Sequence, residues 1–340
     1  MRVSLVLTHQ CNLACTYCYA GTKFRRSMDF ATGLKALRLA FSKPGPVEVS
    51  FFGGEPMIEF SSMARFTRIA HRMARRQRRE VRFAITTNAT ILGPKQVSFL
   101  RHYDFWVALS VDGLGEEHDR HRPFVNGRAS SPLVWTNLEK AVEELPRLHI
   151  LMVVNPDTVD GLVPALERMY RLGVSRVSLL PNLEADWDEA ARARTTECYR
   201  RLAGICYLSM ESGEPLWLSP FVDQHPASMR DGGCGGGCGF GEDEVAVSPL
   251  GRLYPCARLV GTDTRPEVQI GTLDTGPLPA RIEELVQVSE ERLAGCGTGC
   301  RCIPLMPGEL PPQLDNSQFF SQMVASICRE VWKEIQEVAA

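Results

Sequence analysis

Three cysteines near the start of the chain have a spacing that suits metal chemistry. Cys11, Cys15 and Cys18 form a C-x3-C-x2-C pattern directly after the apolar segment 2–8. Structural zinc sites and ordinary iron–sulfur clusters take four protein ligands, so three thiolates leave one coordination position open. An iron with an open position can bind a small molecule. The alternatives are a zinc site completed by His9 and three cysteines in a buried loop without a metal.

The composition indicates a folded protein whose function depends on a local site. Of the 340 residues 44% are hydrophobic, and 38 basic side chains against 40 acidic ones give a formal net charge of −2. The hydrophobic content argues against disorder. The nearly balanced charge argues against binding to nucleic acid or to an anionic membrane through overall charge. Neither a signal-peptide pattern nor an apolar run of about 18 residues is present, so we expect a cytoplasmic protein. Reducing compartments disfavour disulfides, and the 12 cysteines therefore point to metal binding or catalysis.

The first 185 residues alternate short β-rich segments with longer amphipathic ones, which predicts repeated βα units. The predicted strands are 2–8, 46–52, 81–88, 105–111, 149–155 and 174–182. The predicted helices lie near 29–42, 57–78, 94–102, 130–145, 157–172 and 187–212. Right-handed crossovers curl such a parallel sheet, so we expect an α/β fold built as a partial (β/α)6 TIM-like barrel. Its reactive face would carry the C-terminal strand ends.

Short polar or glycine-rich motifs follow four successive predicted strands. They are CNLACTYCY, then Gly53-Gly54-Glu55-Pro56, then Thr86-Thr87-Asn88, and then Ser110-Val111-Asp112-Gly113 with His118-Asp119 and Arg122-Pro123 beyond. Each motif alone is weak, but their order along the strand ends is specific. Together they resemble the radical S-adenosylmethionine (SAM) superfamily, and the resemblance covers residues 1–185.

The resemblance implies a 4Fe-4S cluster on Cys11, Cys15 and Cys18 whose open iron binds SAM. It also implies which residues contact SAM. These are Tyr17, through its backbone near the adenine, with Gly53, Gly54, Glu55, Asn88, Ser110, Arg122 and Leu183. The planar guanidinium of Arg122 suits the SAM carboxylate, and the glycines would let backbone carbonyls approach the SAM ammonium group.

The chain beyond residue 213 loses the βα pattern and becomes rich in glycine, proline and cysteine. Its seven cysteines are Cys234, Cys238, Cys256, Cys296, Cys300, Cys302 and Cys328. A G-x4-C motif ends at Cys256 across a predicted hairpin turn at Pro249-Leu250-Gly251, and this region resembles the SPASM extension that carries auxiliary 4Fe-4S clusters. We therefore expect a radical SAM partial barrel at 1–213 and a cysteine-rich SPASM-like domain at 214–340, with an amphipathic helix at 316–338.

Seven cysteines are one short of the eight that two fully thiolate-ligated clusters need. The expected nearer cluster takes Cys234, Cys238, Cys256 and either Cys300 or Cys302. The farther one takes Cys296, the remaining cysteine of that pair and Cys328. A single auxiliary cluster with spare cysteines and a structural zinc remain alternatives.

Other candidate residues have plainer interpretations. We expect Cys198 and Cys206 to be core residues and the basic stretch from His71 to Arg79 to be a solvated helix end at the bottom of the barrel. His118 and His121 would order the loop after the fourth strand. A deprotonating base is sought among Glu184, Asp186, Glu242 and Asp243. Sulfatase-maturating relatives carry Asp as base after the G-x4-C cysteine; here it is Ala257, which argues against formylglycine formation.

The resemblance implies reductive cleavage of SAM and hydrogen abstraction from a ribosomally made peptide, giving a crosslink or an oxidised residue. The expected partners are that peptide and a flavodoxin- or ferredoxin-type reductant. Because the chain begins at the first barrel strand, a separate leader-binding protein is also expected if the peptide carries a leader. The alternatives are a radical SAM dehydrogenase acting on a small molecule and an iron–sulfur electron carrier without turnover.

Overall fold

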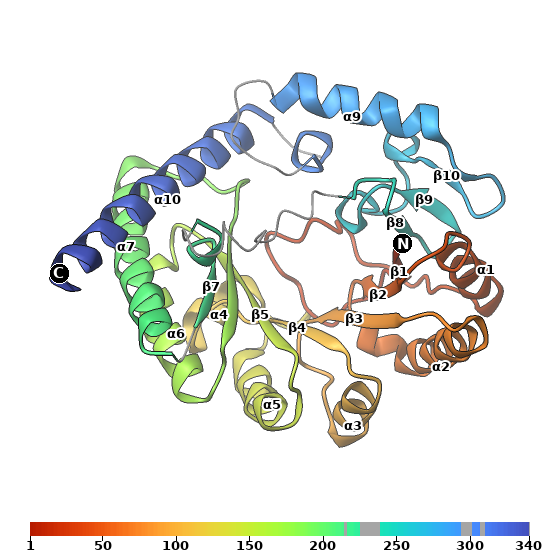
Figure 1. Cartoon of the computed structure of the whole chain (residues 1–340), viewed down its shortest axis with the longest axis horizontal. Coiled ribbons are helices and arrows are strands. Elements are labelled where there is room, and N and C mark those ends of the chain that lie inside the picture. Colours follow the sequence, from red (N-terminus) through yellow and green to blue (C-terminus); the bar gives the residue numbers. More distant parts are fainter. Residues whose placement is uncertain (214–215, 225–238, 294–300, 307–309, 340) are drawn as a thin grey trace.

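A curved sheet of eleven strands runs through the described part of the protein, with its order β11-β10-β9-β8-β1-β2-β3-β4-β5-β6-β7 (Figure 1). The computed structural model describes residues 1–213, 216–224, 239–293, 301–306 and 310–339. The inner strands are apolar; β1, for example, is buried at every position after Arg2. This buried sheet places the strand ends, and the loops that follow them, at one face of the molecule.

Six parallel strands form the barrel portion, and they confirm the predicted βα pattern. They are β1 (Arg2–Thr8), β2 (Val47–Gly53), β3 (Val81–Thr87), β4 (Trp106–Ser110), β5 (Leu148–Val154) and β6 (Arg176–Pro181). Each pairs in parallel with the next one in sequence. The strand bounds lie within two residues of those predicted, because short runs rich in Val, Ile, Leu and Phe mark buried strands well.

Helices cover the outside of the curved sheet (Figure 1). They are α1 (Phe30–Ala40), α2 (Phe60–Gln77), α3 (Pro94–His102), α5 (Ser131–Glu144), α6 (Leu162–Arg171) and α7 (Glu189–Glu211). Asp29 caps α1 and Asp188 caps α7, each accepting a hydrogen bond from a first-turn N–H at 2.7 Å. The short helix α4 (Gly115–His121) lies in the loop after β4 and was not predicted.

The basic stretch at the end of α2 is solvated as predicted. His71, Arg72, Arg75 and Arg76 are exposed. Arg79 instead donates to the carbonyls of Phe41, Lys43 and Gly45 at 2.6–2.9 Å, so it ties the α2–β3 turn to the α1–β2 turn.

The sheet continues beyond the barrel strands, which the sequence pattern did not predict. β7 (Trp217–Ser219) adds to β6, while β8 (Glu244–Val247) pairs in parallel with β1 at the opposite side. β9 (Arg252–Tyr254), β10 (Gly271–Thr272) and β11 (Gly276–Pro277) follow as antiparallel neighbours. The predicted turn joins β8 to β9, and Gly251 there has a φ of 76° that favours glycine. The region after residue 213 is therefore joined to the barrel at both sides, through the pairing of β7 with β6 and of β8 with β1.

Two long helices complete the structure. α9 (Pro279–Leu293) was not predicted, whereas α10 (Leu310–Ala339) confirms the predicted terminal helix and begins six residues earlier than 316. α10 packs along α7 (Figure 1), with Phe320 edge-on to Trp187 at 4.9 Å and Trp332 edge-on to Tyr207 at 5.8 Å between ring centroids. Among the described residues no helix is both long and apolar enough to cross a membrane.

Short 3-10 helices link the elements. They are η1 (Pro56–Glu59), η2 (Val159–Gly161), η3 (Val222–Gln224), η4 (Ala257–Leu259), η5 (Pro266–Val268) and η6 (Ile303–Leu305). Of these, η1 follows the predicted glycine motif and η4 follows Cys256, so both lie beside residues of the candidate site.

Candidate active site

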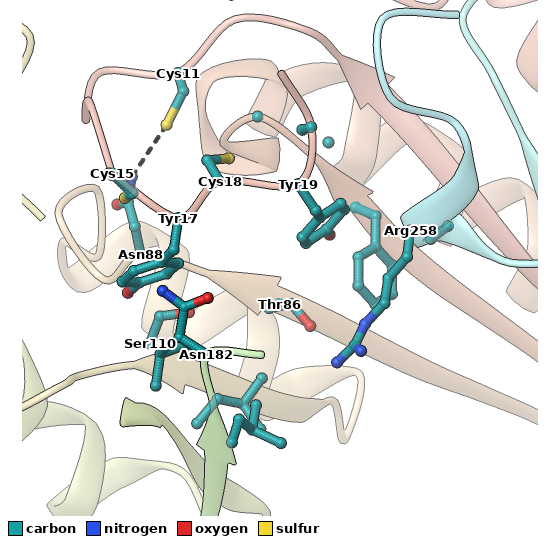
Figure 2. A pocket seen from close by; sticks show the side chains of 18 of the residues that line it. Cys11, Cys15, Tyr17, Cys18, Tyr19, Thr86, Asn88, Ser110, Asn182 and Arg258 are labelled. Atoms are coloured by element: carbon teal, nitrogen blue, oxygen red, sulfur yellow. Dashed lines mark hydrogen bonds between the residues drawn. The ribbon is translucent and has the colours of Figure 1, made fainter. Parts of the chain in front are cut away.

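A cavity of about 520 Å³ lies where the strand C-termini meet the loop after β1 (Figure 2). Its walls include the cysteines and all residues predicted to contact SAM: Cys11, Cys15, Cys18, Tyr17, Gly53, Gly54, Glu55, Asn88, Ser110, Arg122 and Leu183. The later part of the chain adds Glu244, Cys256, Ala257, Arg258, Ile303, Met306 and Gln313. The barrel and the C-terminal region thus enclose one chamber.

The cysteine-bearing loop is held by backbone hydrogen bonds to the segment after α4. The N–H of Ala14 donates to the carbonyl of Pro123 at 2.9 Å, and the N–H of Thr16 donates to the carbonyl of His121 at 3.0 Å. Leu13, fully buried, forms a bridge to Phe124. These contacts fix the loop over the strand ends, so the three thiols share one wall of the chamber.

Polar groups contact two of the three sulfur atoms. Asn88 Nδ2 lies 3.7 Å from Cys11 Sγ, the contact dashed in Figure 2, and the N–H of Leu13 donates to the same sulfur at 3.4 Å. Lys23 Nζ donates to Cys18 Sγ at 2.8 Å. Donors to sulfur stabilise thiolate charge, which is the form that ligates metals.

Burial disfavours the thiolate forms of Cys11 and Cys15. It raises the pKa of Cys11, and it raises the pKa of Cys15 to about 11 although the guanidinium of Arg122 opposes that shift. A bound metal cation overcomes such a penalty because it stabilises the thiolate directly. The environment therefore suits cysteines that become charged only when a metal centre is present.

Glu55 braces the ends of β2 and β3. Its carboxylate is fully buried and accepts hydrogen bonds from the N–H of Met57 at 2.9 Å, from Thr87 Oγ1 at 2.7 Å and from the N–H of Asn88 at 2.7 Å. Burial raises its pKa, and these hydrogen bonds oppose the shift. The sequence resemblance predicted that Glu55 contacts SAM, but its carboxylate accepts three hydrogen bonds from protein groups that connect β2 with β3.

Gly53 and Gly54 allow the ends of β1 and β2 to lie very close together. A Cβ at Gly53 would lie 2.4 Å from the carbonyl oxygen of Thr8, and one at Gly54 would lie 2.2 Å from that of Gln10. Gly53 also has a φ of 142°. The absence of a side chain at Gly53 and Gly54 thus allows the residues that precede Cys11 to pack closely against the end of β2.

Arg122 supplies a buried positive charge beside the cysteine loop. Its Nη1 donates to Tyr17 Oη at 2.6 Å and lies 3.8 Å from Asp112 Oδ2, while Tyr17 Oη also hydrogen-bonds that carboxylate. The Nε of Arg122 is buried and has no hydrogen-bond partner among the described residues. A buried donor without a partner is costly, so this atom fits a ligand carrying an anionic group.

Comparison with known proteins identifies the family. A model of the radical SAM superfamily matches residues 5–169. The chain is 33% identical to the uncharacterized protein MJ0907 of Methanocaldococcus jannaschii over 251 residues, 67% of this chain and 85% of that protein. It is 22% identical to the serine-type anaerobic sulfatase-maturating enzyme of Klebsiella aerogenes over 296 residues, 82% of this chain and 70% of that enzyme. The chain belongs to the radical SAM superfamily.

The fold of this radical SAM protein extends over the whole length of a solved relative. The structure of native anSMEcpe with bound AdoMet and Kp18Cys peptide matches with a TM-score of 0.76 at 18% identity, covering 100% of this chain and 99% of that chain. The shared fold therefore includes the C-terminal region, in agreement with the expected SPASM-type architecture, and is not confined to the barrel.

The cavity residues fit the cofactors of the radical SAM superfamily, a 4Fe-4S cluster and SAM. When bound, these cofactors supply one-electron reductive cleavage of SAM and removal of a hydrogen atom from a substrate. Cys11, Cys15 and Cys18 would hold the cluster, one ligand short of a closed set, and the unpartnered Nε of Arg122 suits the SAM carboxylate. The surrounding chain would orient these groups at the chamber.

The alternative of a zinc site with His9 finds no support in the position of that side chain. His9 stacks on Phe24 with 4.5 Å between ring centroids and does not line the chamber. Among the described residues no group of three or more His, Cys, Asp or Glu side chains is arranged to hold a single metal ion.

The loop after β6 is positioned by α10, a contact that the sequence did not reveal. Asn316 Nδ2 donates to the carbonyls of Leu183 and Ala185 at 3.0 and 3.1 Å. Gln313 lines the chamber and lies 3.4 Å from Glu184. A helix that begins more than a hundred residues after Leu183 thus closes the wall that would meet the adenine.

The described C-terminal cysteines fall into two places. Cys256 lines the chamber, and its thiol hydrogen-bonds with Cys302, which lowers the pKa of Cys256. Cys328 lies on α10 beside Tyr207, where burial raises its pKa. Cys234, Cys238, Cys296 and Cys300 lie outside the described residues, so the expected cluster assignments involving them stay predictions.

The remaining candidates behave largely as the sequence indicated. Cys206 is buried, and Cys198 and Cys206 hydrogen-bond backbone carbonyls at 3.7 and 3.4 Å. His118 accepts from the N–H of Asp112 at 3.2 Å and so orders the loop after β4. Of the four acidic candidates Glu184 lines the chamber, and burial raises its pKa. Sequence reasoning gave no role to Tyr19, Lys23 and Arg258, which line the same chamber (Figure 2 labels Tyr19 and Arg258). Tyr19 ends the CNLACTYCY motif, whereas Lys23 and Arg258 lie outside the quoted motifs.

Proposed function

We propose that this radical SAM protein removes a hydrogen atom from a residue of a ribosomally made peptide, as the first step of a crosslink or an oxidation. The observation that carries the proposal is the chamber that joins the cysteine loop to Cys256 and Arg258 of the C-terminal region. A target C–H placed there would lie against the SAM site and away from bulk water.

Relatives and solved neighbours support a peptide as substrate. The anSMEcpe structure contains AdoMet and a peptide, and its fold covers this whole chain. Ala257 lines the chamber, at the position where the resemblance implies a base in sulfatase-maturating enzymes. An alanine cannot remove a proton, so the proposed reaction is a peptide modification other than formylglycine formation.

The proposal includes an auxiliary iron–sulfur centre at the second wall of the chamber. The contact between the Cys256 and Cys302 thiols supports their sharing one cluster, in a cysteine-rich region at 214–340 that follows a barrel domain at 1–213. Iron counting after anaerobic reconstitution tests this: about eight irons per chain indicate two 4Fe-4S clusters, about twelve indicate three, and about four would exclude an auxiliary cluster.

The reaction needs a one-electron donor. We propose a flavodoxin- or ferredoxin-type protein of the cytoplasm for this role, and a separate leader-binding protein where the peptide carries a leader. Reduction of the reconstituted enzyme by a flavodoxin hydroquinone, followed by its visible spectrum, tests the donor class.

Isotope transfer tests the substrate. A deuterated short peptide encoded beside this gene is incubated with reconstituted enzyme, SAM and dithionite, and 5′-deoxyadenosine is analysed by mass spectrometry. Deuterium in 5′-deoxyadenosine supports the proposal. Uncoupled SAM cleavage without deuterium transfer from any such peptide would favour a small-molecule substrate, and no SAM cleavage would favour an electron carrier.

A further inference from the structure

Lys23 places a cationic side chain directly against a cysteine of the N-terminal motif. Its Nζ donates to Cys18 Sγ at 2.8 Å, and the residue lines the chamber while being only half-buried. One ammonium group therefore contacts a sulfur atom that is predicted to ligate the cluster.

The other cations of the chamber are engaged elsewhere. Arg122 donates to Tyr17 and lies beside Asp112, on the Cys15 side of the loop. Arg258 lies by Tyr19 and Cys256. Lys23 forms no ion pair with a carboxylate within the described ranges, so its charge is not neutralised by an acidic partner there.

We propose that Lys23 sets the reduction potential of the cluster held by Cys11, Cys15 and Cys18. The inference rests on the proposed placement of that cluster on these cysteines. Lys23 lies in the loop after β1, five residues beyond Cys18.

The physical reason is charge. Reduction adds one electron to a centre that already carries thiolate charge, so a nearby ammonium stabilises the reduced form more than the oxidised form. A hydrogen bond to the ligating sulfur acts in the same direction, because it withdraws electron density from the iron. Lys23 thereby makes the cluster easier to reduce by a biological donor.

The experiment measures the midpoint potential directly. The wild-type protein, Lys23→Met and Lys23→Arg are reconstituted anaerobically and titrated with a redox mediator set, with the reduced cluster followed by electron paramagnetic resonance without SAM. We expect Lys23→Met to lower the equilibrium constant for reduction about tenfold, which is ~59 mV for a one-electron couple. Lys23→Arg, which keeps the charge, is expected to retain most of the wild-type potential.

The matched control is Lys35→Met, which removes a lysine that pairs with Asp274 at the surface. Its potential is expected to equal that of the wild type. Equal potentials for Lys23→Met and wild type would overturn the inference, as would an equal shift in Lys35→Met. A weaker affinity for SAM in Lys23→Met without any shift in potential would also overturn it, because Lys23 would then act as a SAM ligand.

A further variant separates this inference from the proposed site. Cys18→Ser is expected to lose the signal and the iron of the N-terminal cluster. If Cys18→Ser kept both, the placement of the cluster would be wrong. If Cys18→Ser lost both while Lys23→Met kept the wild-type potential, only the role of Lys23 would be wrong.

Discussion

Several polar and charged side chains at the chamber form hydrogen bonds within the protein, and these contacts hold the loops of the site together. Glu55 accepts three hydrogen bonds from within the protein, and Tyr17, which was expected near the adenine through its backbone, places its hydroxyl between Arg122 and Asp112. Burial of unpaired charge is expensive, so each of these groups has a partner from a different strand end. Hydrogen bonds between different strand ends thus hold the residues of the predicted SAM site in place.

A pH effect on stability is expected from His118. The ring is buried, Nδ1 accepts from the N–H of Asp112 and Nε2 lies 3.1 Å from Ser130 Oγ, so the neutral form is the one that fits. Burial lowers its pKa to about 4, below 6.5 for the unfolded chain. Below pH 6.5 the unfolded state binds a proton that the folded state does not, and stability falls as the pH drops towards 4, by up to about 3 kcal/mol.

Urea unfolding of the apoprotein between pH 4.5 and 7.5 measures this effect. His118→Gln, which keeps an acceptor and a donor but does not titrate, should flatten the pH dependence. An unchanged slope in that variant would show that other groups cause it.

At this scale the sequence predicted which residues gather at the site but not how they are used. The cysteine spacing and the strand-end motifs are local patterns, so Cys11, Asn88 and Arg122 could be chosen from sequence. The bond between Tyr17 and Arg122 joins residues 105 positions apart, and nothing local encodes it. Lys23 lacked a motif and became visible only through its contact with Cys18.

The elements that bring these residues together are the β1–β2 ends and α10. A Cβ at Gly54 would meet the carbonyl of Gln10, the residue before Cys11. We expect Gly54→Ala to destabilise the apoprotein by about 1–3 kcal/mol and to reduce iron incorporation, because the cysteine loop must shift.

Gly204→Ala is the matched control for this change. Gly204 lies within α7, and a Cβ there has no neighbour within 4 Å, so alanine should stabilise the protein by about 0.5–1 kcal/mol. Urea unfolding and iron analysis of both variants provide the measurement. Normal iron incorporation and stability in Gly54→Ala would show that the close approach is not required.

Asn316 is expected to support SAM binding from a distance. Asn316→Ala removes two hydrogen bonds to the carbonyls of Leu183 and Ala185 and leaves them without these donors, at a cost of about 1–3 kcal/mol. The loosened loop after β6 should weaken SAM binding several-fold in equilibrium dialysis with reconstituted protein. Ser326→Ala, which removes a hydroxyl that contacts Glu330 farther along α10, should leave SAM affinity unchanged, and equal affinities for all three proteins would contradict this role of α10.

Helices and strands could be predicted from the sequence where their apolar residues recur at regular intervals. Strands β1 to β6 and their helices follow from apolar periodicity, whereas β7 to β11 have at most four residues each and carry little periodic signal. The pairing of β8 with β1 joins residues more than 240 positions apart, and only the assembled sheet shows it. The same holds for the contact of α10 with the loop after β6.

Across the whole molecule, one chamber collects residues from the first strand loop to the last helix. Cys11 and Gln313 both line this chamber, although they lie far apart in the sequence. The fold matches a solved radical SAM relative over its full length, and the C-terminal region extends the barrel sheet through β8. A substrate entering this chamber would contact both regions.

A cluster on Cys11, Cys15 and Cys18 is expected to support the reductive cleavage of SAM. The formation of 5′-deoxyadenosine by anaerobically reconstituted protein with SAM and dithionite, quantified by mass spectrometry, tests this expectation. We expect turnover by the wild type, none by Cys15→Ala, and turnover close to wild type by Cys198→Ala, whose thiol lies on α7 against the carbonyl of Val159. Undiminished 5′-deoxyadenosine formation by Cys15→Ala would show that these cysteines do not hold the cluster that cleaves SAM.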